Sequence, residues 1–130
     1  MKKRLKSFFT SLKEMSRKRF FIIATVTSLL FLAASILLPI WRLFPDITER
    51  FAIPLHYNIH SGVDLFGAWQ RIFTPAIIGA SIFIANFLIA IALWRKEQVL
   101  SYFLAAVAVI VQIIVFVSMV FVVLLNLTYG

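Results

Sequence analysis

Three long apolar runs, at residues 20–41, 72–94 and 99–125, constrain this chain more than any other feature. None of them contains Asp, Glu, Lys, Arg or His. Roughly 20 apolar residues in a helix cross about 30 Å of hydrocarbon, so each run is long enough to span a bilayer. A backbone inside hydrocarbon must satisfy its own polar groups, which favours helices. The sequence therefore predicts an all-α membrane protein with three transmembrane helices.

The composition agrees with this class and removes some chemistry. Of the 130 residues 62% are hydrophobic and only 14% are charged, whereas soluble domains carry about 25% charged residues. There is no cysteine, which excludes disulfides, thiolate metal sites and cysteine nucleophiles. We expect two parts, a cytoplasmic arm at residues 1–19 and a transmembrane domain at residues 20–130.

The charges predict the orientation of the chain in the cell (plasma or inner) membrane. Residues 1–19 hold eight lysines and arginines against one glutamate, a net charge of +7. The loop at residues 42–71 is neutral, and the short link at residues 95–98 holds two basic residues and one acid. Because cytoplasmic segments carry the excess of Lys and Arg, we expect the N-terminus and the link inside, and the loop and the C-terminus outside.

Within residues 1–19, apolar side chains recur at steps of one, three and four residues between the basic ones. They are Leu5, Phe8, Phe9, Leu12 and Met15. This pattern predicts an amphipathic helix on the membrane surface, with anionic lipid headgroups as its partners. A docking surface for an acidic cytoplasmic protein is the alternative, and nucleic-acid binding is not expected.

The loop at residues 42–71 holds both histidines. Apolar and polar residues alternate over residues 51–60, which predicts an extended segment with His56, Asn58 and His60 on its wet side. Ser61 and Gly62 predict a turn, after which residues 63–71 would lead back into the membrane. The expected fold is thus three helices, an N-terminal interfacial helix and an extended outer loop.

His56 and His60 are the metal-ligand candidates. On a strand they would lie about 13 Å apart, whereas on a helix they would share one face with Asp64 as a zinc-type set. Asp46 and Glu49 are the further acids of the loop. A ligand- or metal-binding component of a transport system is therefore the alternative function.

Polar residues inside the runs predict contacts between helices. If the link turns tightly, Gln112 lies at about the height of Ser81. Matching the outer ends of the first two runs places Asn86 near Thr27 and Ser28. Small residues around Gly79 would let a neighbouring helix approach closely. We interpret these residues as packing contacts, with a polar path as the minor alternative.

A short motif surrounds the histidines, of the form Pro-x-His-aromatic-Asn followed by a glycine. Its positions, with the acid that follows and the proline near the start of the second run, are Pro54, His56, Asn58, Gly62, Asp64 and Pro75. Residues 20–94 resemble a family of uncharacterised bacterial membrane proteins, related to the N-terminal domain of the immunity proteins against the sporulation-delaying toxin. The family has no established enzymatic activity, so the resemblance implies a membrane protein of unknown role in which this element is a family feature.

The sequence favours an interaction protein over an enzyme. No Ser or Cys is placed with a base as a nucleophile, and no carboxylate pair has matched geometry, so we expect neither catalysis nor a cofactor. The predicted role is to bind or regulate a protein or peptide partner through the outer loop, at Pro54, His56, Asn58, Gly62 and Asp64. Self-association is a further expectation, because three helices offer little interior.

Overall fold

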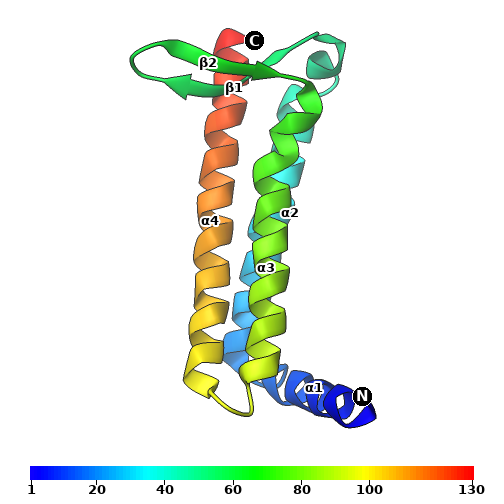
Figure 1. Ribbon diagram of the computed structural model, residues 1–130. Helices are drawn as coiled ribbons and strands as arrows, with labels where there is room; N and C mark the ends of the chain where they lie inside the picture. Colours follow the sequence, from blue (N-terminus) through cyan, green and yellow to red (C-terminus); the bar gives the residue numbers. More distant parts are fainter.

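The computed structural model describes residues 1–130 and consists mostly of helix. Helices α2 (Arg19–Leu43), α3 (Thr74–Leu93) and α4 (Gln98–Tyr129) run side by side in a long bundle, as Figure 1 shows. Helix α1 (Lys2–Met15) lies across one end of the bundle. Three helical segments are each long and apolar enough to cross a membrane: α2, α4, and the segment formed by α3 with the short turn before it. The predicted all-α membrane fold is confirmed.

Helix α4 is the centre of the bundle. It packs against both α2 and α3, while those two helices touch each other at fewer positions. Its buried residues recur at steps of three and four, so they form one stripe: Ser101, Ala105, Ala108, Gln112, Val115, Met119, Val123 and Asn126. The residues nearest the 95–98 link are small, which lets the neighbouring backbones approach closely there.

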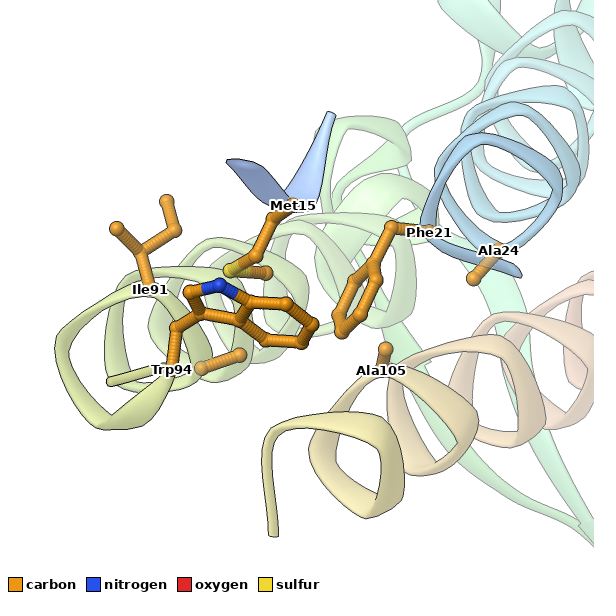
Figure 2. Packing of buried hydrophobic residues seen from close by; sticks show 7 residues of the cluster. Met15, Phe21, Ala24, Ile91, Trp94 and Ala105 are labelled. Atoms are coloured by element: carbon orange, nitrogen blue, oxygen red, sulfur yellow. The ribbon is translucent and has the colours of Figure 1, made fainter. Parts of the chain in front are cut away.

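An apolar cluster joins α1 to the bundle at the end that carries the 95–98 link. Figure 2 shows Trp94, just beyond α3, packed between Met15 of α1 and Phe21 of α2. The Trp94 and Phe21 rings meet edge to face at 5.4 Å, and the Trp94 Nε1–H donates to Glu14 Oε2 at 3.1 Å. Glu14 and Met15 are the last residues of α1. The hydrogen bond from Trp94 to Glu14 and the packing of Trp94 on Met15 therefore hold that end of the helix against the bundle.

The far end of α1 keeps a free apolar stripe. Leu5, Phe9 and Leu12 are exposed, as the amphipathic pattern requires for a helix on a lipid surface. Met15, which belongs to the same predicted stripe, is instead buried at 2% exposure. The stripe is therefore divided between exposed positions and the protein interior.

A β-hairpin covers the other end of the bundle. Strand β1 (Ile53–Asn58) pairs antiparallel with β2 (Gly62–Gly67), and short 3₁₀ turns at Asp46–Glu49 and Trp69–Phe73 connect the hairpin to α2 and α3. The extended segment was predicted, whereas the pairing of the residues after Gly62 with β1 was not. Residues after Gly62 first pair with β1, because backbone groups of an isolated strand would otherwise lack partners.

Candidate partner-binding site at the hairpin

The hairpin is attached to the bundle through β1. Ile53 is fully buried in an apolar cluster with Ile72 of the 3₁₀ turn and Met119 of α4. The Asn126 Nδ2–H donates to the Pro54 backbone oxygen at 2.7 Å, and the rings of Tyr57 and Tyr129 stack at 5.7 Å. The end of α4 therefore fixes the position of β1, while β2 forms the outer edge (Figure 1).

Two predicted site residues meet across the hairpin. His56 Nδ1 lies 2.7 Å from Asp64 Oδ1, and both side chains are partly or largely exposed. The pairing register shifts on either side of His56, which marks a bulge. Strand pairing thus brings together an imidazole and a carboxylate that are eight residues apart in the chain.

Asn58 and Gly62 shape the turn. The Asn58 side-chain Oδ1 accepts a hydrogen bond from the His60 backbone N–H at 3.0 Å. Gly62 has a φ of 75°, a conformation that glycine adopts without the steric cost of a Cβ atom. Both residues of the motif therefore have a local structural role, since they close the loop between the strands.

The predicted apolar face of residues 51–60 is only partly covered. Ile53 is buried and Leu55 is half-buried, whereas Phe51 and Ile59 are 103% and 82% exposed. Phe66 on β2 is also exposed. Ile59 is exposed because β1 packs on α4 near its start and the turn lies beyond that contact, whereas Phe51 precedes β1 and lies outside the paired segment. Exposed apolar side chains are therefore present at both the base and the tip of the hairpin.

Two hollows lie beneath the hairpin. The larger, of about 610 Å³, is formed by Leu55, His56 and Tyr57 of β1 together with the last turns of α4. A second, of about 560 Å³, lies toward α3 and shares Leu55 with the first. Both volumes fall within the roughly 300–1,000 Å³ of ligand sites, and both are lined mainly by apolar side chains.

The histidines do not form a metal-ligand set. No group of three or more His, Asp or Glu side chains is close enough to hold one metal ion. The helical arrangement that would align His56, His60 and Asp64 is not adopted, because residues 53–58 form a strand. The structure brings His56 to Asp64 and leaves His60 in the turn, where its backbone N–H is bound by Asn58.

The predicted polar residues within the membrane are placed differently from one another. Gln112 is fully buried, and its Nε2–H donates to the backbone oxygen of Gly79 at 2.7 Å, two residues from the expected Ser81. The Ser81 hydroxyl instead donates to Ile77 in its own helix. Asn86 Nδ2 is buried without a hydrogen-bond partner, so the expected bond from Asn86 to the first helix is absent.

Sequence reasoning missed the contacts that attach the hairpin to the end of α4. Asn126 and Tyr129 follow the third apolar run, and a polar residue there reads as the end of a span rather than as an anchor for a strand. The partner of Asn126 lies 72 residues away. The sequence offers one local signal, because Asn126 continues the three- and four-residue spacing that runs along α4 from Gln112.

Comparison of the chain with protein-family models, curated proteins and solved structures found no match. The family resemblance of residues 20–94 therefore stays a prediction. The fold alone defines the class: three helices able to cross a bilayer make the chain a small multi-pass membrane protein. More particularly, it carries a β-hairpin over one end of its bundle and an amphipathic helix at the other.

Proposed function

We propose that this protein binds a protein or peptide partner at the hairpin, on the outer side of the cell membrane. The observation that carries the proposal is the position of the hairpin. It is fixed to α4 through β1, its β2 edge is unpaired, and exposed apolar side chains stand beside two apolar hollows. An unpaired edge can accept an extended peptide as a further strand, with side-chain pockets giving specificity.

The arrangement of charge supports the orientation. Helix α1 and the 95–98 link lie at the same end of the bundle, where Arg95 is 4.0 Å from Glu14. The hairpin and the C-terminus lie together at the opposite end (Figure 1). A cytoplasmic location for the basic end then leaves the hairpin outside.

Cysteine labelling tests this orientation cleanly, because the chain has no native cysteine. Ile59 in the hairpin and Val99 at the start of α4 are matched probes, being 82% and 83% exposed. We expect Ile59→Cys to react with a membrane-impermeant maleimide in intact cells and Val99→Cys to react only after permeabilisation. The reverse pattern would place the hairpin inside the cell and contradict the proposal.

Photocrosslinking tests partner binding. A benzophenone amino acid is placed at Phe66 on β2, with the same change at Phe103 near the inner end of α4 as control. The two phenylalanines are 57% and 61% exposed. We expect a crosslinked product of discrete mass from position 66 that position 103 does not give. No discrete product at 66, or identical products from both positions, would argue against a hairpin partner.

The motif variants then locate the recognition element. His56→Ala or Asn58→Ala is expected to abolish the crosslinked product while membrane abundance stays unchanged. His56 contributes a ring to the larger hollow, and Asn58 holds the turn. If the product survives both changes, the partner is recognised elsewhere on the protein.

A further inference from the structure

The corner between α1 and α2 contains an apolar groove at the opposite end from the hairpin. It measures about 490 Å³ and lies between the end of α1, the start of α2 and the second half of α3. Leu12, Met15, Ile22, Val26 and Phe87 are among its lining residues, and none of the lining residues is charged. Its chemistry fits a hydrocarbon chain.

The groove runs along two helices and is open along one side. It follows α2 from Phe21 to Val26 and α3 from Phe83 to Ile91. Ile22, Val26 and Ile84 are each about half exposed, so the groove opens sideways to the surrounding lipid.

Uncompensated positive charge stands directly beside the groove. Ser16 lines it, and the next three residues are Arg17, Lys18 and Arg19, here called the basic corner. All three are exposed, and none lies in an ion pair. Glu14, the acid of the arm, instead lies near Arg95 and accepts the Trp94 hydrogen bond.

The basic corner also borders a polar hollow of about 360 Å³. Arg17 and Lys18 line it together with Glu14, Trp94 and Gln98. The end of α1 thus contributes to both an apolar groove and a hollow lined by two basic residues, which match the two halves of an anionic phospholipid.

We propose that this corner binds one anionic phospholipid, with an acyl chain in the apolar groove and its phosphate at the basic corner. The lipid would fill the space beneath α1 and fix the angle of that helix on the membrane. The inference does not depend on the partner proposed for the hairpin.

Native mass spectrometry of the detergent-purified full chain tests the headgroup. The protein is mixed with equal amounts of phosphatidylglycerol and phosphatidylcholine, and we expect one phosphatidylglycerol to be retained preferentially. Each basic residue at an anionic surface strengthens binding about fivefold, so changing all three residues of the basic corner to Gln should weaken retention roughly 100-fold. The matched control changes Lys2, Lys3 and Arg4 to Gln, the same loss of charge at the far end of α1, and should retain the lipid.

Filling the groove tests the acyl chain independently of charge. Val26→Trp places a large ring in the groove, and Ile23→Trp makes a similar change on an exposed position that does not line it. We expect the lipid to be lost from the first variant and kept by the second. Three results would overturn the proposal: equal retention of the two lipids, equal loss of lipid in the two charge variants, or retention of lipid by Val26→Trp. Purification of the protein as a dimer without bound lipid would overturn it as well.

Discussion

Replacing Asn126 by leucine is expected to loosen the hairpin while leaving the rest of the membrane domain intact. Asn126 is 2% exposed, and its side-chain amide donates to the backbone oxygen of Pro54, itself a buried residue, at 2.7 Å. Leucine has a similar volume and cannot donate. The second bond of this amide, to Val122, lies within α4, so its loss leaves the helix backbone paired.

The magnitude follows from the lost donor. A buried carbonyl deprived of its partner costs about 1–3 kcal/mol, which shifts the equilibrium for opening the hairpin roughly 5- to 150-fold. Local opening of this kind is measured by amide hydrogen exchange. In nanodiscs, the backbone amides of β1 and β2 should exchange faster by that factor in Asn126→Leu.

Gln112→Leu is the matched control, because it removes a buried side-chain donor at 0% exposure far from the hairpin. It should leave the exchange of β1 and β2 unchanged and accelerate exchange only near Gly79. If the hairpin amides of Asn126→Leu stay within twofold of the parent protein, the bond to Pro54 does not hold the hairpin, and the reasoning fails.

Three further perturbations probe other contacts. In Gly79→Ala the new Cβ would lie 2.9 Å from a Val115 methyl, so we expect a loss of about 1–3 kcal/mol, seen as a lower thermal midpoint in detergent. An unchanged midpoint would show that the helices separate at no cost. Trp94→Ala should lose about 3–5 kcal/mol of unfolding free energy, and Trp94→Phe clearly less, because the ring remains. Equal losses would assign the effect to the hydrogen bond instead. A double-mutant cycle on His56 and Asp64 should give a coupling of at most about 1 kcal/mol, since the pair is exposed. A coupling above 2 kcal/mol would contradict a surface pair.

The three spans could be predicted from sequence because the cost of placing a residue in hydrocarbon depends mainly on that residue and its near neighbours. Runs of 20 or more uncharged residues therefore identify helices without knowledge of their packing. The amphipathic helix followed for the same reason, since its pattern is contained within residues 2–15. The structure moved only the ends, beginning α3 at Thr74 and extending α4 to Tyr129.

The hairpin and its attachment were decided by the tertiary structure. Strand alternation at residues 51–60 is local, but pairing with β2 and the contact of His56 with Asp64 depend on the turn and on a bulge. The bond between Asn126 and Pro54 joins residues 72 positions apart. The sequence by itself determined where the chain crosses the membrane, because solvation is local. Which polar groups meet at the two ends was decided by the tertiary structure, because those contacts exist only once distant segments are brought together.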